Sequence, residues 1–471
     1  MRRSLFSVAV PAAIEEHMLE YLIRDDREED LLFALWNPSQ GTTRYTALIF
    51  KPIFPEKGDR QRHGNASFNS QYLERVCTLA MEQKAGVAFI HSHPVPGWQA
   101  MSDDDVVAEK KLAGPVLSLT GLPLLGLTVG TNNIWSARFW EHDHGKIFQR
   151  KWCQTVRSVG KNLKVSFNNY LVPKPKYQAE FKRTLTVWGK ENHAHLVRLK
   201  IGIIGVGSVG SFVAEQLSRM GFENLTLIDF DIIKSHNLDR TLSATKNDIG
   251  RLKVSVIKDL INQSHTANRI VLNSIPYSIA EKEGYQAALD CDVLFSCVDR
   301  PRARRILNHL AFAHLIPVID GGIQVRFKEQ NFTGADWQLQ TASPDRPCLE
   351  CLGVYNNADV ATEIEGKLDD PSYIKGLSTA HRLRHNENVI AFSANLASLE
   401  VLQLIALVTG IAGIDDFGIQ RYRYNPGIVE QDAARTCRNE CIHLSLTAQG
   451  DKDFDLYGKC KVAEKTRLEA K

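Results

Sequence analysis

One stretch, KIGIIGVGSVGSFVAEQLSRMGFENLTLIDFD at residues 200–231, restricts the possible folds of this chain more than any other. Its pattern predicts an apolar strand, a glycine-rich turn, a helix and a second strand. Gly205, Gly207 and Gly210 allow a tight turn and a close approach of the backbone to phosphate, which the amino terminus of a helix also favours. The segment therefore predicts a nucleotide-binding α/β domain.

The alternation of strands and helices continues beyond this unit. Apolar runs at 292–299 and 316–323 predict further strands, and 388–410 predicts a long apolar helix that lies against them. Strands that alternate with helices form mostly parallel sheets covered on both faces. We therefore expect a doubly wound, mostly parallel sheet in the second part of the chain.

Residues 1–145 have a different pattern, which predicts a separate α+β domain. Its predicted elements are strands at 31–36 and 46–54, a helix at 70–84 and a buried strand at 86–94. The uncharged segment 112–130 contains Pro115 and Pro123, so it is expected to form short buried strands and not a membrane helix.

Composition limits the class of protein. A chain of 471 residues, 44% hydrophobic and 24% charged, is typical of a soluble globular protein with two or three domains. A net charge of +3 gives no support for a nucleic-acid partner. The sequence shows no secretory signal, and the spacing of its nine cysteines does not resemble a disulfide framework. We therefore expect a cytoplasmic protein without a membrane segment.

A basic stretch separates the two predicted domains. Residues 145–183 hold ten Lys or Arg against the single acid Glu180. A solvated face accounts for most such runs, and an acidic partner is the less common explanation. This places a linker at 146–180 and the second domain at 181–471.

The segment HSHPVPGWQAMSDDD, residues 91–105, follows the predicted strand at 86–94. His91 and His93 leave the same face of an extended segment, so both can bind Zn²⁺, and a carboxylate can complete a three-ligand catalytic site. His-x-His-Pro followed by Ser-x-x-Asp resembles the motif of the JAMM (JAB/MPN) zinc isopeptidases. Eight residues separate His93 from Ser102, where the family's common motif has seven. Keeping the family's Ser-x-x-Asp spacing selects Asp105 as the third ligand. Keeping the family's distance from the second histidine to the aspartate selects Asp104 instead.

The JAMM resemblance also implies a general base and an oxyanion ligand. Glu29, at the start of EDLLFALW, is the preferred match for the upstream glutamate, and Glu28 is its alternative. In the family this glutamate takes a proton from zinc-bound water and returns it to the leaving amine. The resemblance implies that Ser102 hydrogen-bonds the tetrahedral oxyanion.

The glycine-rich unit alone would be compatible with a dinucleotide, with Asp229 as a ribose ligand. However, DFDIIKSHNLDR and CVDRPRARRILN resemble the ThiF/MoeB and ubiquitin-activating family, which adenylates the C-terminal glycine of ubiquitin-like proteins with ATP and Mg²⁺. The resemblance spans about residues 180–445. It implies Asp229 for the ribose, Arg240 and Lys253 for the phosphates, Asp299 for magnesium, Asn237 and Arg304 at further family positions, and Arg183 reaching into the partner subunit's nucleotide site.

Two cysteine pairs form a second candidate metal site. Cys348 and Cys351 are separated by two residues, and Cys437 and Cys441 by three. Four thiolates from two distant turns can make a closed structural zinc site. The family often has two residues within each pair, so the second pair departs from its pattern. Two unliganded pairs of reduced thiols are the alternative.

Together these resemblances imply a JAMM isopeptidase fused to an activating domain, with a ubiquitin-like protein ending in glycine, a conjugating partner and a homodimer. Such fusions look like bacterial ubiquitination-like systems, some of them in phage-defence operons. Sulfur-carrier activation and a nucleotide-binding scaffold with degenerate sites are the alternatives.

No cysteine occurs in residues 353–387, where family members that form a thioester carry their catalytic cysteine, and only Cys460 is placed to replace it. We therefore expect direct transfer of the adenylate to a partner.

Overall fold

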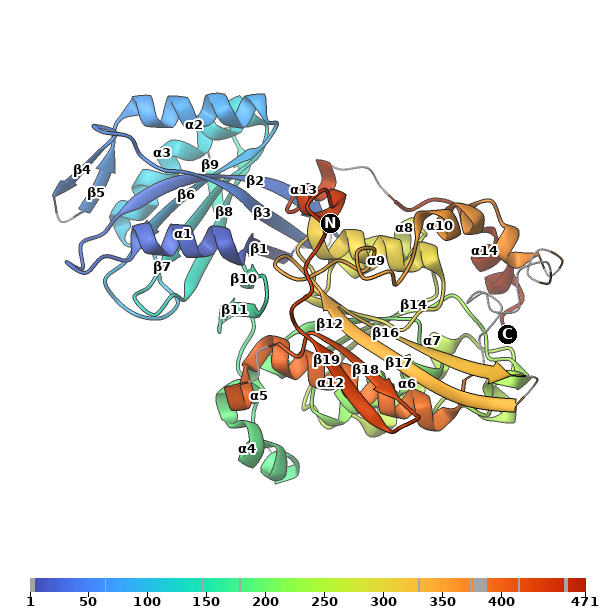
Figure 1. The fold of residues 1–471 in the computed structure, drawn as a ribbon. Coiled ribbons are helices and arrows are strands. Elements are labelled where there is room, and N and C mark those ends of the chain that lie inside the picture. Colours follow the sequence, from blue (N-terminus) through green and yellow to red (C-terminus); the bar gives the residue numbers. More distant parts are fainter. Residues whose placement is uncertain are drawn as a thin grey trace. The chain divides into compact units, whose positions relative to one another are not determined.

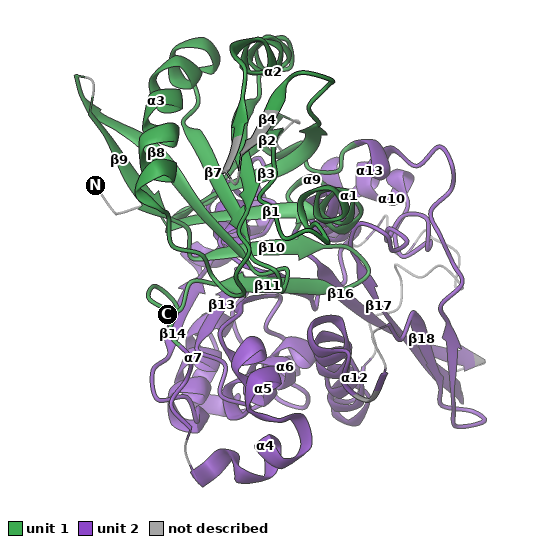
Figure 2. Cartoon of the chain, turned by 90° about the vertical axis from the view of Figure 1, so that its left-hand side faces the viewer, with its two compact units in different colours: residues 1–173, 313–315, 446–454 green, residues 174–312, 316–445, 455–471 purple. Residues whose placement is uncertain are grey.

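The computed structural model describes residues 5–63, 65–145, 147–177, 179–328, 331–370, 372, 375, 388–413, 416–452 and 456–471. Its internal contacts divide the chain into two compact units, which Figure 2 distinguishes by colour. Unit 1 comprises residues 1–173, 313–315 and 446–454, and unit 2 comprises 174–312, 316–445 and 455–471.

Unit 1 is built on a nine-stranded mixed sheet of order β11-β10-β1-β3-β2-β6-β7-β8-β9. The strands are β1 Leu5–Pro11, β2 Leu31–Gln40, β3 Arg44–Ile53, β6 Gly86–Ser92, β7 Leu124–Val129, β8 Trp135–His144, β9 Ile147–Trp152, β10 Thr155–Val159 and β11 Leu163–Phe167. The helices are α1 Ala12–Leu22, α2 Ser70–Glu82 and α3 Asp103–Thr120, and β4 Arg60–His63 pairs with β5 Asn65–Phe68 as a separate hairpin.

The sheet of unit 1 is covered on both faces, as Figure 1 shows. In β2, Leu32, Ala34 and Trp36 belong to the core that includes α1. The alternate residues, such as Leu31 and Phe33, belong to the core that includes α2 and α3. Because successive side chains of a strand point to opposite faces, an uninterrupted apolar run suits a strand buried on both sides.

Two segments of unit 1 differ from the sequence expectation. Residues 147–167, expected in a basic linker, form β9, β10 and β11, because apolar residues such as Val156, Val159 and Phe167 are buried. Arg157 is buried with them, whereas Arg150 and Lys164 are exposed. Residues 112–120, expected as a strand, are the end of α3, which contains Pro115 and ends at Gly121 in the left-handed conformation. Burial of Leu112, Ala113 and Val116 against the sheet offsets the helix-breaking tendency of the proline.

Unit 2 contains an eight-stranded sheet of order β14-β13-β12-β15-β16-β17-β18-β19. The first five strands are parallel neighbours, in the order typical of a doubly wound fold, and β17 to β19 extend the sheet antiparallel. The strands are β12 Lys200–Ile204, β13 Asn224–Ile228, β14 Val271–Ile275, β15 Val293–Ser296, β16 Val318–Lys328, β17 Asn331–Ala342, β18 Ile419–Arg423 and β19 Ile428–Asp432. The predicted α/β fold with a mostly parallel core is confirmed for this unit.

Helices cover both faces of this sheet (Figure 1). They are α4 Lys182–Trp188, α5 Lys190–Val197, α6 Ser208–Arg219, α7 Lys253–Ser264, α8 Lys282–Leu289, α9 Pro301–Ala313, α10 Asn357–Ile364, α12 Ile390–Thr409, α13 Ile442–Ser445 and α14 Lys461–Leu468. Among the described residues, α12 alone is long and apolar enough to cross a membrane. It packs against α6, β16 and β17, and 56% of its apolar window is buried, as in a core helix.

Candidate active sites and metal centres

Two imidazoles and a carboxylate converge at one end of the unit 1 sheet. His91 lies in β6, His93 follows that strand, and Asp105 lies in the first turn of α3. Asp105 Oδ1 is 3.3 Å from His91 Nε2, and its Oδ2 is 3.4 Å from His93 Nε2. The three groups offer ligand atoms within 4.8 Å of one another. Of the two aspartates considered from the sequence, the structure brings Asp105 to the histidines.

The donor set of this cluster fits zinc. Two imidazoles and one carboxylate are a common three-ligand set for catalytic Zn²⁺, which leaves a fourth position for water. Although burial raises the pKa of Asp105, hydrogen bonds from the two imidazoles outweigh it and hold that pKa well below its usual range. Asp105 is therefore a carboxylate at neutral pH, as a metal ligand must be.

The other residues expected at this cluster lie at its rim. Burial raises the pKa of Glu29, and the charges of His93, His91 and Asp105 also act on it, so Glu29 lies near the cluster. Glu28 is exposed. Ser102 Oγ accepts a hydrogen bond from the backbone N–H of Asp105 at 3.1 Å. That bond uses an oxygen lone pair of Ser102 and leaves its hydroxyl hydrogen to donate.

A buried polar chain that sequence reasoning missed supports His91. Thr128 Oγ1 lies 3.3 Å from His91 Nε2 and accepts a hydrogen bond from Arg138 at 2.6 Å. Arg138 in turn pairs with Glu109, to which Trp140 Nε1 also donates. The partners come from three different elements, β7, β8 and α3, so no local spacing in the sequence signals the whole chain.

In unit 2 the glycine turn meets the ends of the parallel strands. Gly205 follows β12 with φ +84°, and a Cβ at Gly210 would lie 1.9 Å from the carbonyl oxygen of Gly205. Asp229 follows β13, and its Oδ2 accepts a hydrogen bond from Val206 N–H at 2.9 Å. Burial raises the pKa of Asp229, and the charge of Lys253 opposes that rise. Carboxyl ends of parallel strands share one edge of the sheet, so these groups lie where open α/β sheets bind ligands.

Lys253 is the central cation of this edge. Its Nζ donates to Asp231 Oδ2 at 2.9 Å, and it lies 3.8 Å from the position of a Cβ at Gly207. Burial lowers the pKa of Lys253, but Asp229, Asp231 and Asp299 outweigh this and raise it. Sequence reasoning missed Asp231, although the DFD spacing offered a signal, because alternate residues share one side of an extended chain.

The remaining predicted residues of unit 2 have other contacts. Arg240 donates to His236 O at 2.6 Å, and Asn237 Oδ1 accepts from Lys234 N–H at 2.9 Å. Arg304 pairs at 3.2 Å with Asp320, whose side chain is 1% exposed, so we assign it a role in the core. Arg183 is exposed on α4, a helix with no buried residue.

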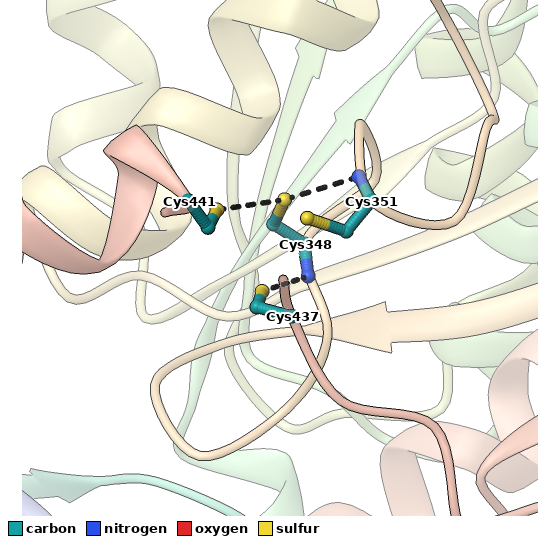
Figure 3. Close-up of side chains that lie close together, drawn as sticks. All are labelled: Cys348, Cys351, Cys437 and Cys441. Atoms are coloured by element: carbon teal, nitrogen blue, oxygen red, sulfur yellow. Dashed lines mark hydrogen bonds between the residues drawn. The ribbon is translucent and has the colours of Figure 1, made fainter. Parts of the chain in front are cut away.

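The four cysteines come together as expected. Figure 3 shows Cys348, Cys351, Cys437 and Cys441 with their sulfur atoms facing one another, and the four Sγ atoms lie within 4.8 Å. Cys348 N–H donates to Cys437 Sγ at 3.1 Å, and Cys351 N–H donates to Cys348 Sγ at 3.3 Å. All four thiols are free, and backbone N–H donors stabilise thiolates, so the cluster fits structural zinc.

Comparison with known proteins identifies the second half of the chain. The model of the ThiF family matches residues 181–435, more than half of the chain. The chain therefore belongs to the ThiF family.

Three curated relatives match parts of the chain. The molybdopterin-synthase adenylyltransferase of Escherichia coli is 25% identical over 173 residues, 36% of this chain and 66% of the relative. The tRNA threonylcarbamoyladenosine dehydratase of Haemophilus influenzae is 39% identical over 97 residues, 20% of this chain and 37% of the relative. The SUMO-activating enzyme subunit uba-2 of Caenorhabditis elegans is 30% identical over 137 residues, 28% of this chain and 23% of the relative. The chain thus spans less than two thirds of each relative's length.

Proposed function

We propose that this chain is a bifunctional enzyme of a ubiquitin-like conjugation pathway. Unit 2 adenylates the C-terminal glycine of a ubiquitin-like protein, and unit 1 is a zinc isopeptidase that releases or matures the same protein. The first activity is supported by Lys253 beside the glycine turn in a ThiF-family domain. The second is supported by His91, His93 and Asp105, which offer three ligand atoms within 4.8 Å.

The groups of unit 2 suit attack of a carboxylate on the α-phosphate of ATP. The new carboxylate–phosphorus bond forms as the bond to pyrophosphate breaks, so negative charge must be neutralised throughout. Lys253 supplies one cation, and a rotation of Arg240 would supply another. Asp299 and Asp231 offer the carboxylate oxygens that magnesium prefers, and magnesium, when bound, neutralises the phosphates.

The groups of unit 1 suit hydrolysis of an amide after glycine. Zinc, when bound, supplies a Lewis acid that activates water. Glu29 accepts the proton of the attacking water and returns it to the leaving amine, while the Ser102 hydroxyl donates to the oxyanion.

Each activity has a direct test on the full-length chain. With a ubiquitin-like protein ending in glycine, we expect modifier-dependent ATP–pyrophosphate exchange that Asp299→Ala abolishes. With the same modifier carrying a C-terminal extension, we expect cleavage that chelation or His91→Ala abolishes. Exchange that survives in Asp299→Ala contradicts the first assignment, and cleavage that survives in His91→Ala contradicts the second.

Sulfur-carrier activation is a second candidate, favoured by the molybdopterin-synthase adenylyltransferase among the relatives. In that pathway a sulfur donor converts the adenylate to a thiocarboxylate. Mass spectrometry of the modifier after incubation with ATP and a sulfur donor separates the candidates. A nucleotide-binding scaffold remains the third candidate, and turnover of ATP excludes it.

A homodimer is part of the proposal. Arg183 lies before α5, which leads into the amino end of β12, whereas the glycine turn follows the carboxyl end of that strand. We infer that Arg183 completes the partner subunit's site. Mixing inactive Arg183→Ala with inactive Asp299→Ala should restore part of the exchange activity, because one site of the mixed dimer is intact. A monomer that still adenylates contradicts this.

A further inference from the structure

Gln99 is a buried side chain whose orientation is set by the backbone around it. It lies in the loop between β6 and α3 and is 5% exposed. Its Nε2 donates to Val95 O at 3.0 Å and to Gly97 O at 2.7 Å. Both partners are carbonyl oxygens, which only accept, so the amide nitrogen and not the amide oxygen must face them. The Oε1 atom then points the other way.

That oxygen faces the second histidine of the zinc candidate. Gln99 Oε1 lies 3.4 Å from His93 Nδ1. Because an amide oxygen only accepts, His93 Nδ1 must carry the hydrogen of the pair. In the neutral imidazole the lone pair is then on Nε2, the atom 3.4 Å from Asp105 and 3.2 Å from His91 Nε2. This is the tautomer that a metal at the cluster requires of His93.

The end of β7 is shaped to hold this loop. Gly130 follows β7, and a Cβ there would lie 2.7 Å from Val95 O and 2.8 Å from Gln99 Nε2. Thr131 N–H donates to Val95 O at 3.1 Å, and Asn132 Oδ1 accepts from Gly97 N–H at 2.7 Å. The position of Gln99 is therefore fixed by contacts that do not involve the histidine.

We propose that Gln99 is a positioning residue that holds His93 in its Nδ1–H tautomer and so presents Nε2 to the metal of unit 1. The inference rests on the zinc site of the proposed function. The Nδ1 atom of His91 has no equivalent support, because it is buried without a hydrogen-bond partner within the described residues, and the contact of His91 with Thr128 is made at Nε2. Gln99 is thus the side chain that sets the tautomer of His93 from outside the ligand set.

The test uses the full-length chain, with the variant Gln99→Ala and the matched control Asn132→Ala. The control removes the hydrogen bond from Gly97 N–H to Asn132, which holds the same loop but does not involve His93. Zinc affinity is measured by chelator competition. The zinc bound by the His91→Ala variant is subtracted, because that variant keeps the cysteine cluster but lacks a ligand of the unit 1 site. Nitrogen-15 NMR of histidine-labelled, metal-free protein reports the tautomer of His93, whose signals are assigned with His93→Gln.

We expect Gln99→Ala to weaken zinc at the unit 1 site by about 10- to 100-fold and to lose the single Nδ1–H tautomer of His93. Asn132→Ala should keep that tautomer and lose much less affinity. Unchanged affinity and tautomer in Gln99→Ala overturn the inference, and so does an equal loss in both variants with the tautomer kept. If the wild-type chain and His91→Ala bind the same amount of zinc, unit 1 holds no zinc at His91. That outcome contradicts the zinc site of the proposed function and is distinguishable from the two outcomes that concern Gln99.

Discussion

The carboxylate of Asp105 accepts a hydrogen bond from the backbone N–H of Ser102 at 2.8 Å, and Ser102 Oγ accepts one from Asp105 N–H at 3.1 Å. This reciprocal pair is a capping box, which begins α3 at Ser102. The same carboxylate faces His91 and His93. The Ser-x-x-Asp spacing is therefore the spacing of a helix start, and it carries the third candidate ligand to the histidines.

We predict that Asp105→Asn removes one equivalent of zinc and abolishes isopeptidase activity, whereas Asp104→Asn keeps both. Asparagine retains the size of the side chain but loses the charge that a third zinc ligand supplies. Weakening the capping box should also cost about 1 kcal/mol of stability. Metal analysis, cleavage of an extended modifier and thermal unfolding check the three effects. Zinc loss in Asp104→Asn alone would assign the ligand to the other aspartate.

We predict that Lys253→Ala lowers ATP–pyrophosphate exchange by about 100-fold or more, because the cation beside the glycine turn, which would neutralise developing charge, is lost. Lys258→Ala is the matched control, since Lys258 is exposed on the same helix, α7. We expect that variant to keep wild-type exchange. Equal activity of the two variants would show that the edge of the sheet around Lys253 is not the reaction site.

The cysteine cluster is predicted to hold a second zinc that stabilises unit 2. Cys441→Ser should lose this metal and destabilise the fold by several kcal/mol, because the closed thiolate site joins two distant turns. Cys460→Ser leaves the cluster intact and should keep both metal and stability. Metal content and urea denaturation of the two variants provide the measurement, and full zinc occupancy in Cys441→Ser would contradict the assignment.

Glu400 is predicted to make unit 2 less stable as the pH rises. Burial and the nearby Asp320 raise the pKa of this fully buried carboxyl well above its ordinary value, against the effects of Cys297 and Arg304. The folded chain then keeps a proton that the unfolded chain releases near pH 4.3. Stability is fully present below the unfolded pKa and is lost as the pH rises towards the folded pKa, by about 1.4 kcal/mol per pH unit.

Glu400→Gln should remove this part of the pH dependence, so its stability relative to wild type should be greater at pH 8 than at pH 6 by about 1–3 kcal/mol. Asp320, whose pKa burial also raises, leaves some dependence in the variant. Glu365→Gln, at an exposed position, is the control. Urea denaturation at both pH values gives the comparison, and parallel pH curves for Glu400→Gln and wild type would contradict the prediction.

We predict that no thioester forms on this chain. Of residues 353–387, which contain no cysteine, positions 371, 373–374 and 376–387 lie outside the described part. Burial raises the pKa of the Cys297 thiol well above its ordinary value, and thiols, unlike thiolates, are poor nucleophiles. Cys460 is partly exposed at the start of α14. A non-reducing gel after incubation with ATP and modifier should show no thiol-sensitive adduct, and one that disappears in Cys460→Ala would refute this.

The sequence determined the features that depend on short spacings. The glycine turn between β12 and α6 and the pairs His91/His93 and Cys348/Cys351 each involve residues within a few positions of one another. Local backbone geometry places such residues, so the pattern of residue types was sufficient to predict them. The parallel core of unit 2 follows similarly from the alternation of strands and helices.

Only the tertiary structure decided which distant segments meet. Strand β10 pairs with β1, nearly 150 positions earlier, so residues 147–167 join a sheet although their basic composition suggested a linker. Arg304 meets Asp320 in the core, and Gln99 meets His93 only because Gly130 leaves space for its loop. Such contacts depend on strand register and packing across the whole unit, and no local spacing encodes them.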